Sequence, residues 1–151
     1  MTTSQSQPIM IVEDSDDDYE ATERALKKDG RLVNPLIRFE SAEEAVDYLL
    51  RRNAYADQKT APRPGIILLD LNMPGAGGHA VLKALRTSES LRDIPVVVLT
   101  TSNDPRDVKK SYAEGANSYV VKPVTVDGYF NAIRQLKEYW VDLSILPGEP
   151  S

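Results

Sequence analysis

Side chains that can do chemistry follow short apolar runs at four places in the chain. They are Glu13, Asp14, Asp70, Thr100 and Lys122. Three clustered carboxylates repel one another unless a cation or protons intervene. A set of oxygen donors without His or Cys selects a hard ion such as Mg²⁺, which binds few carboxylates and keeps several waters.

These residue types together fit the transfer of a phosphoryl group. Asp70 can act as the nucleophile. Mg²⁺ and the Lys122 ammonium would offset negative charge on the transferring oxygens, and the Thr100 hydroxyl can hydrogen-bond to them. Taken singly, each residue has an ordinary explanation as a solvated strand end, a surface lysine or a β-branched strand residue. Their joint placement favours a site.

The elements that must position them alternate regularly along the chain. Apolar runs predict strands at 9–12, 36–39, 66–69, 96–99 and 118–121. Helical patterns or caps lie between and after them, at 16–28, 41–50, from about 78, at 104–115 and from 126 to beyond 140. Such alternation predicts a parallel sheet covered by helices on both faces. Ligands of these sheets bind at the carboxyl ends of the strands, where the five side chains stand.

Composition narrows the class of protein. The chain has 151 residues, a net charge of −5 and no cysteine. We therefore expect one domain without disulfides, thiolate metal sites or a catalytic thiol. We expect no nucleic-acid partner, because such domains carry a basic patch. No apolar run is long enough to span a membrane, and no signal peptide is evident, so we expect a cytoplasmic protein. We interpret the acids at 16–18 as a solvated helix start.

Four segments resemble the receiver-domain motifs of two-component response regulators. They read IVEDS at 11–15, LDLNMP at 69–74, LTT at 99–101 and YVVKP at 119–123. The resemblance runs from about Pro8 to Tyr139 and implies a flavodoxin-like α/β fold, a doubly wound parallel sheet of five strands in the order 2-1-3-4-5. We divide the chain into a disordered N-terminus (1–7), a receiver domain with an extended last helix (8–143) and a C-terminal tail (144–151).

The resemblance also implies a role for each site residue. Asp70 corresponds to the phosphoacceptor, Asp14 to a direct Mg²⁺ ligand and Glu13 to a ligand acting through water. Asn72 would give its backbone carbonyl to the metal and place its amide near the hydrolytic water. Lys122 would contact the phosphoryl group, and the bond to the proline that follows it is usually cis in the family.

Thr100 and Tyr119 correspond to the family's switch pair. The resemblance implies that the Thr100 hydroxyl moves to the phosphoryl group while the Tyr119 ring turns inward. The change would reshape the face formed by the fourth helix, the fifth strand and the fifth helix.

The implied function is that of a single-domain response regulator phosphorylated on Asp70 by a sensor histidine kinase. It would be a signalling phosphoacceptor that catalyses only its own phosphotransfer and dephosphorylation. The alternative is a receiver-like scaffold that binds protein without phosphotransfer. An aspartyl phosphatase is disfavoured, because position 72 is Asn where a second acid is needed. A flavin or nucleotide binder is disfavoured because no Gly-rich loop follows the first strand.

Two features depart from a minimal receiver. The connection at 51–65 is unusually long. The apolar stripe of the last helix continues through Tyr139, Trp140 and Leu143. This end either folds back on its own domain or forms a homodimer face. Both features resemble the single-domain regulators that work with phytochrome-type sensor kinases.

Overall fold

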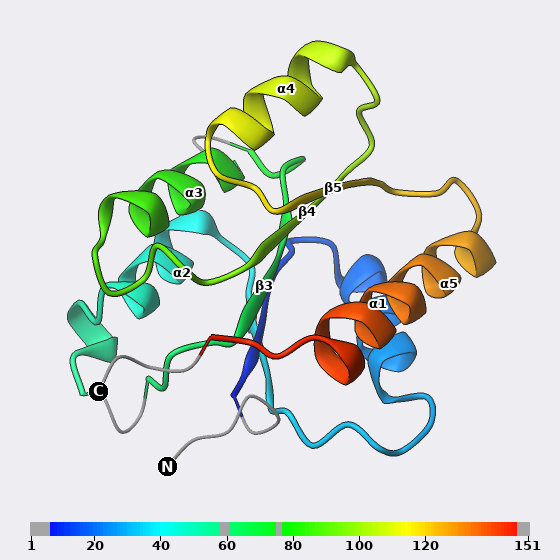
Figure 1. The fold of residues 1–151 in the computed structure, drawn as a ribbon, viewed down its shortest axis with the longest axis horizontal. Helices are drawn as coiled ribbons and strands as arrows, with labels where there is room; N and C mark the ends of the chain where they lie inside the picture. Colours follow the sequence, from blue (N-terminus) through cyan, green and yellow to red (C-terminus); the bar gives the residue numbers. More distant parts are fainter. Residues whose placement is uncertain (1–6, 58–60, 75–76, 148–151) are drawn as a thin grey trace.

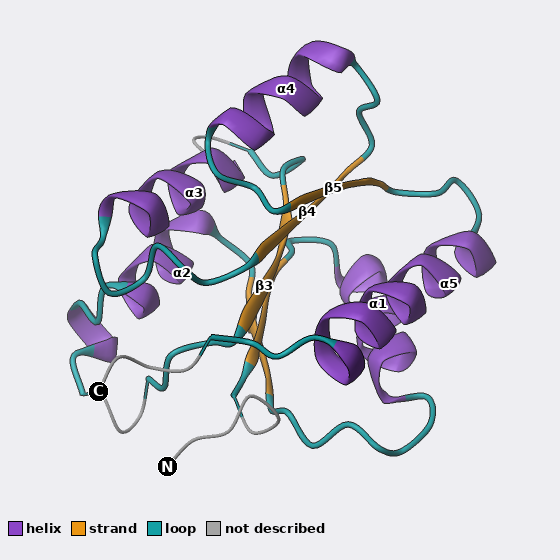
Figure 2. Cartoon of the chain, in the orientation of Figure 1, coloured by secondary structure: helices purple, strands orange, loops and turns teal. Residues whose placement is uncertain are grey.

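A five-stranded parallel sheet forms the centre of the molecule (Figures 1 and 2). The computed structural model describes residues 7–57, 61–74 and 77–147. The strands are β1 (Ile9–Val12), β2 (Leu36–Phe39), β3 (Ile66–Asp70), β4 (Val96–Thr100) and β5 (Ser118–Val121). Their order is β2-β1-β3-β4-β5, which confirms the predicted topology.

Helices follow the strands, and four of them begin at a side-chain cap, which the sequence predicted in part. They are α1 (Asp16–Lys27), α2 (Ala42–Leu49), α3 (Gly77–Thr87), α4 (Pro105–Ala113) and α5 (Val126–Leu136). The Ser41 hydroxyl accepts the Glu44 N–H at the start of α2, and the Asp104 carboxylate accepts the Arg106 N–H at the start of α4. Two further segments are η1 (Asn53–Tyr55), a 3₁₀ turn, and η2 (Lys137–Leu143), a π-helical continuation of α5.

The two faces of the sheet are covered by different helices (Figure 1). Successive strand side chains point to opposite faces, so Met10 and Val12 join one apolar core while Ile9 and Ile11 join the other. The first core packs against α2 and α3, and the second against α1 and α5. Burial on both faces explains why the strands are continuous aliphatic runs.

The long connection at 51–65 is partly ordered against the domain. Tyr55 of η1 packs edge-on against Phe39 and Tyr48. Arg63 is buried and pairs with Asp93, and its Nε donates to the Ser90 carbonyl. The described part of this connection is therefore attached to the loop that follows α3.

The first and last residues that the structure describes, Gln7 and Pro147, are in contact beside the amino end of β1. Leu146 is buried against the core that contains Ile9, and the Gln7 side-chain amide donates to the Pro147 carbonyl at 3.0 Å. The described part of the tail, 144–147, therefore folds back on its own domain. Gln7, which we placed in the disordered N-terminus, is buried. Residues 1–6 and 148–151 of the two predicted end segments lie outside the described residues.

Among the residues described, no helix combines the length and the apolar character that crossing a bilayer requires.

Candidate functional site

Strand register brings the predicted site residues to one edge of the sheet. Val12 pairs with Leu69, so Glu13, the next residue, lies level with Asp70 at the end of β3. Lys122 follows β5, and its backbone N–H donates to the Thr100 carbonyl at 2.7 Å. The sheet alone therefore gathers the four strand ends.

Asp70 is the buried centre of this edge. Only 2% of the residue is exposed. Its Oδ1 accepts the Asn72 backbone N–H at 2.8 Å, and its Oδ2 lies 3.4 Å from Lys122 Nζ. One carboxylate oxygen is thus oriented by the turn after β3, and the other faces a cation. A carboxylate oriented in this way is well placed to act as a nucleophile.

Lys122 joins the site to the start of α1. Its Nζ donates to Glu13 Oε1 at 3.0 Å and to Asp18 Oδ2 at 2.8 Å. Burial lowers the pKa of the ammonium, but the Asp18 hydrogen bond and the charges of Glu13 and Asp70 outweigh it and set the net pKa above the usual range. Lys122 is therefore a fixed positive charge. Our interpretation of Asp18 as only a solvated helix-start acid was wrong, because its carboxylate contacts the site lysine.

Glu13, Asp14 and Asp70 form a cluster of oxygen donors. One carboxylate oxygen from each lies within 4.8 Å of the other two. Glu13 is buried and Asp14 is exposed. Burial and the adjacent Asp70 carboxyl raise the pKa of Glu13 to about 8, although Lys122 opposes the shift. Negative charge at this edge is therefore not fully compensated by the protein. A divalent cation with a preference for oxygen ligands fits such a cluster.

Asn72 orders the loop beside Asp70. Its side-chain Oδ1 accepts the Thr101 backbone N–H at 2.8 Å and lies 3.4 Å from the Thr101 hydroxyl. The amide therefore holds the segment after β4 against the turn after β3. Its predicted roles toward the metal and the hydrolytic water stay predictions.

Thr100 and Tyr119 both bond to Ser102. Thr100 is buried, and its Oγ1 accepts the Ser102 backbone N–H at 3.3 Å. The Tyr119 ring is half-buried against the core, and its hydroxyl donates to the Ser102 carbonyl at 2.8 Å. Sequence reasoning did not single out Ser102, because a serine after a strand is an ordinary loop residue. Only its hydrogen bonds distinguish it.

The peptide bond between Lys122 and Pro123 differs from the expectation drawn from the family. We expected a cis bond, and it is trans; none of the peptide bonds in the described part of the chain is cis. The trans bond still places the Lys122 ammonium within reach of Asp70.

The end of the last helix is divided between core and surface. Tyr139 and Leu143 are 55% and 74% exposed. Trp140 is half-buried, and it packs against the core that contains Ile9 and stacks edge-on against Tyr139. Of the three predicted interface residues, two therefore offer free apolar surface, while Trp140 mainly supports its own domain.

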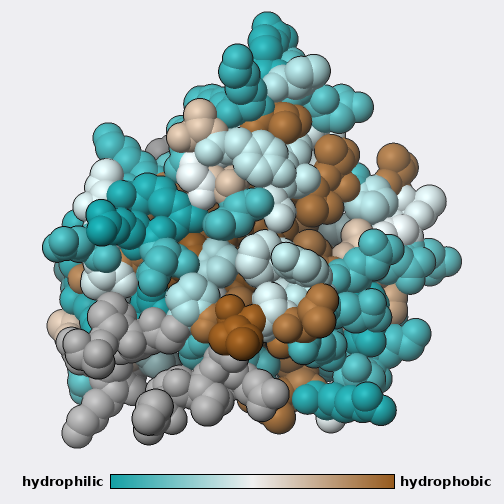
Figure 3. Space-filling model, in the orientation of Figure 1, coloured by the Kyte–Doolittle hydropathy of each residue, from teal (hydrophilic) through white to brown (hydrophobic). Residues whose placement is uncertain are grey.

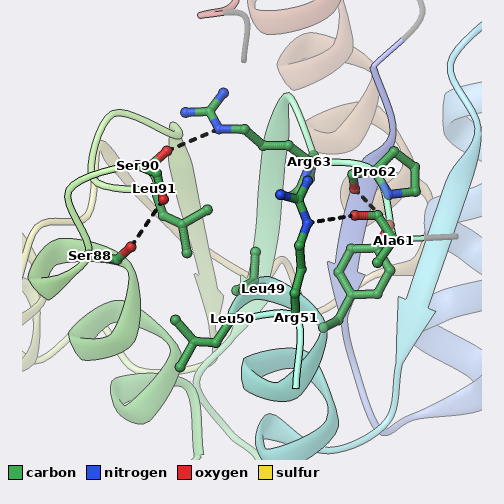
Figure 4. A pocket seen from close by; sticks show the side chains of 11 residues that line it. Leu49, Leu50, Arg51, Ala61, Pro62, Arg63, Ser88, Ser90 and Leu91 are labelled. Carbon is green, nitrogen blue, oxygen red and sulfur yellow. Dashed lines mark hydrogen bonds between the residues drawn. The ribbon is translucent and has the colours of Figure 1, made fainter. Parts of the chain in front are cut away.

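A separate cavity lies at the other end of the sheet, where β3 begins (Figure 4). It has a volume of about 210 Å³ and lies between the end of α2, the segment before β3 and the loop after α3. Arg51 and Arg63 extend into this region, where Arg51 donates to the Ala61 carbonyl and Arg63 to the Ser90 carbonyl. Both guanidinium groups thus hold the loop in place.

The chain is similar to known proteins over almost its whole length. Residues 9–134 match the model of the response regulator receiver domain. Response regulator Rcp1 of Synechocystis sp. is 34% identical over 139 residues, which cover 92% of each protein. The "Probable methanogenesis regulatory protein FilR2" of Methanothrix harundinacea is 35% identical over 140 residues, which cover 93% of this chain and 87% of FilR2.

Solved structures resemble it equally well. The phosphorylated cyanobacterial phytochrome response regulator RcpA superposes with a TM-score of 0.87 at 32% identity, and the match covers 95% of this chain and 99% of RcpA. The Mn²⁺-bound form of Rcp1 gives a TM-score of 0.85 at 32% identity, over 94% of this chain and 99% of the Rcp1 chain. Fold and sequence therefore lead to the same relatives.

Proposed function

The chain belongs to the response regulator receiver domain family, and on this premise we propose that it accepts a phosphoryl group on Asp70 from the histidine of a sensor kinase. The observation that carries the proposal is the setting of Asp70. Its carboxylate is buried, oriented by the Asn72 N–H, and placed between the Lys122 ammonium and two further carboxylates. The protein would act as a signalling phosphoacceptor and not as an enzyme that turns over an external substrate.

In the proposed transfer, an oxygen of the Asp70 carboxylate attacks phosphorus. An O–P bond forms as the N–P bond of the donor phosphohistidine breaks, and the histidine keeps the electron pair of that bond. Lys122 Nζ is already 3.4 Å from Asp70 Oδ2, so its positive charge can stabilise negative charge on the transferred oxygens. The Thr100 hydroxyl supplies a hydrogen bond to the product. Attack of water at the same phosphorus later breaks the O–P bond to Asp70, which restores the carboxylate and releases inorganic phosphate.

Mg²⁺ is the cation that we propose for the acidic cluster. Asp14 and Asp70 would bind it directly, Glu13 through water, and Asn72 through its backbone carbonyl. When bound, the ion offsets negative charge on the phosphoryl oxygens. The Mn²⁺-bound form of the relative Rcp1 supports a divalent cation, and the oxygen-only donor set supports Mg²⁺.

A phytochrome-type sensor histidine kinase is the partner that we propose. The relative RcpA is a cyanobacterial phytochrome response regulator, and the likeness to it spans 95% of this chain. The output would pass through the face of α4, β5 and α5. We further propose a homodimer that uses this face and the exposed end of the last helix, where Tyr139 and Leu143 leave apolar surface free.

Treatment with acetyl phosphate and Mg²⁺ tests the central proposal. Intact-mass measurement should show one added phosphoryl group that survives acid and is lost in mild base. Asp70→Asn should abolish the adduct, and a metal chelator should prevent it in the wild type. Asp127→Asn changes an exposed aspartate of α5 and serves as the matched control. A wild-type protein without the adduct, or an undiminished adduct in Asp70→Asn, would overturn the proposal.

A further inference from the structure

The last helix changes its geometry after Leu136. There α5 ends, and η2 continues it as a π-helix over Lys137–Leu143. The Ser144 backbone N–H donates to the Tyr139 carbonyl, five residues earlier, at 2.8 Å, which is the spacing of a π-helix. The sequence predicted one continuous helix with a single apolar stripe, so the structure differs from the sequence pattern at this end.

This change of geometry decides which apolar residues face the core. Leu143 follows Leu136 by seven residues, about two turns of an α-helix, so a regular helix would put both on the core face. In the structure Leu136, Trp140 and Val141 pack against the core, whereas Leu143 is 74% exposed. A π turn holds more residues than an α turn, so it rotates Leu143 off the core face. Figure 3 shows hydrophobic surface over this end of the chain, where Ile145 is also exposed.

A buried lysine joins the two ends of η2. Only 2% of Lys137 is exposed. Its Nζ donates to Asp142 Oδ2 at 3.1 Å and to Oδ2 of Asp29, which follows α1, at 3.2 Å. Residues five apart lie about 140° apart around an α-helix, whereas one π turn brings them together. The contact between Lys137 and Asp142 therefore favours the π-helix over the α-helix.

Both carboxylates are needed to balance the cations at this point. Arg134 Nη2 lies 3.4 Å from Asp29 Oδ2, the same oxygen that accepts a hydrogen bond from Lys137. Asp29 thus faces two positive groups, and Asp142 supplies the second negative charge. Because a buried ammonium is costly unless it is paired, Asp142 is drawn to Lys137.

Close packing does not hold η2 on this side. A cavity of about 350 Å³ lies between residues 29–34, after α1, and η2. Lys137, Val141 and Asp142 line it. Side chains that border such a space have few close neighbours to set their position. The ion pairs therefore hold this side of η2.

We infer that the bridge from Lys137 to Asp142 keeps the end of the last helix in the π form and thereby exposes Leu143 as surface for a second copy of this chain. The choice of a second copy as the partner rests on the proposed homodimer. Without the bridge, η2 would return to the α form. Leu143 would then move to the core face, and Val141 would move away from it.

Thiol labelling of single cysteines tests the helix form, because the chain has no cysteine of its own. With maleimide, Leu143→Cys should react quickly and Val141→Cys slowly. Adding Asp142→Ala should slow labelling at 143 and speed it at 141, each by roughly tenfold, the equilibrium factor of burying one leucine-sized side chain. The protein is diluted until light scattering gives the mass of one chain, so that a partner does not cover position 143.

A conservative variant and a matched control accompany the labelling. Asp142→Glu keeps the carboxylate and should restore the rates seen with Asp142. Glu138→Ala, at an exposed acid of the same segment, should leave both rates unchanged. Unchanged rates in Asp142→Ala would overturn the inference. Faster labelling at both positions would overturn it too, because fraying of the helix end exposes both residues and a change of helix form does not.

Light scattering at higher concentration separates the inference from the proposed homodimer. Asp142→Ala should weaken the dimer by roughly tenfold, because it withdraws Leu143 from the surface. Equal dimerisation of the wild type and an Asp142→Ala protein with slowed labelling at 143 would overturn the link to the partner. A wild type that stays a single chain at every concentration would count against the proposed homodimer, and the labelling pattern decides the helix form independently.

Discussion

Asp18 Oδ2 lies 2.8 Å from Lys122 Nζ, although 104 residues separate them in the chain. The first turn of α1 therefore takes part in the charge balance at Asp70. Lys122 also contacts Glu13 and Asp70, so one ammonium offsets part of the negative charge of three carboxyl groups. Such a shared cation is difficult to replace.

Replacing Lys122 by Ala should slow phosphoryl uptake by about a hundredfold or more, the usual effect of losing one fixed donor from a site of charge development. The buried Glu13 and Asp70 would also lose their partner, so the free energy of unfolding should fall. Mass-monitored uptake from acetyl phosphate and urea denaturation measure the two effects. Lys83→Ala, at an exposed lysine of α3, is the control. Equal uptake by Lys122→Ala and the control would contradict the role given to Lys122.

Mg²⁺ affinity should rise with pH up to about 8. Burial and Asp70 raise the pKa of Glu13 to about 8, so below that pH this carboxyl holds a proton in the metal-free protein. Binding of the cation must displace the proton, and the competition weakens affinity as the pH falls. Calorimetric titration in two buffers of different ionisation enthalpy should detect proton release at pH 6.5 and little at pH 9.

Glu13→Gln should flatten this pH dependence, because an amide has no proton to release. Asp127→Asn should leave it unchanged. Equal Mg²⁺ affinity of the wild type at pH 6.5 and pH 9 would show that Glu13 does not control binding.

Stability in acid should depend on Asp29, which follows α1. The Arg31 backbone N–H and the Lys137 ammonium lower the pKa of Asp29 from 3.8 to about 2. Because the folded-state pKa lies below the ordinary value, the stabilisation is present above about pH 4 and is lost as the pH falls toward 2. Asp29→Asn should therefore unfold more easily than the wild type at pH 7, and the two should converge below pH 4.

Thermal unfolding at pH 7, 4 and 3 measures this difference. Asp127→Asn should remain close to the wild type at pH 7. A constant difference between Asp29→Asn and the wild type across the range would show that the carboxylate charge is not its source.

Dimerisation should respond to Leu143 more cleanly than to Trp140. The Leu143 side chain is 74% exposed, so Leu143→Ser should lower the mass in light scattering and leave thermal unfolding of the monomer unchanged. Trp140 packs against the core, and Trp140→Ala should cost about 2 kcal/mol of folding stability whatever the assembly state. A mass that is unchanged in Leu143→Ser and Tyr139→Ser would remove the end of the last helix from the interface.

The amino-acid sequence by itself determined the sheet and the place of the site. Parallel strands buried on both faces need continuous aliphatic runs, and their order follows from the family motifs. Because side chains that follow such strands meet at one edge, Glu13, Asp70, Thr100 and Lys122 could be brought together from the sequence alone. The caps at Ser41 and Asp104 could also be predicted from the sequence, because a cap depends only on residues two or three positions away.

Only the tertiary structure decided which long-range contacts the side chains make. The bond from Lys122 to Asp18 depends on how α1 lies against the sheet, and the burial of Trp140 depends on where η2 packs. Ser102 resembles any loop serine until Thr100, Tyr119 and Asp107 surround it. Periodicity specifies which face of an element is apolar, but the distance between two side chains on different elements depends on how those elements pack. The contacts that govern charge balance and switching in this receiver join side chains on different elements, so they depend on how those elements pack.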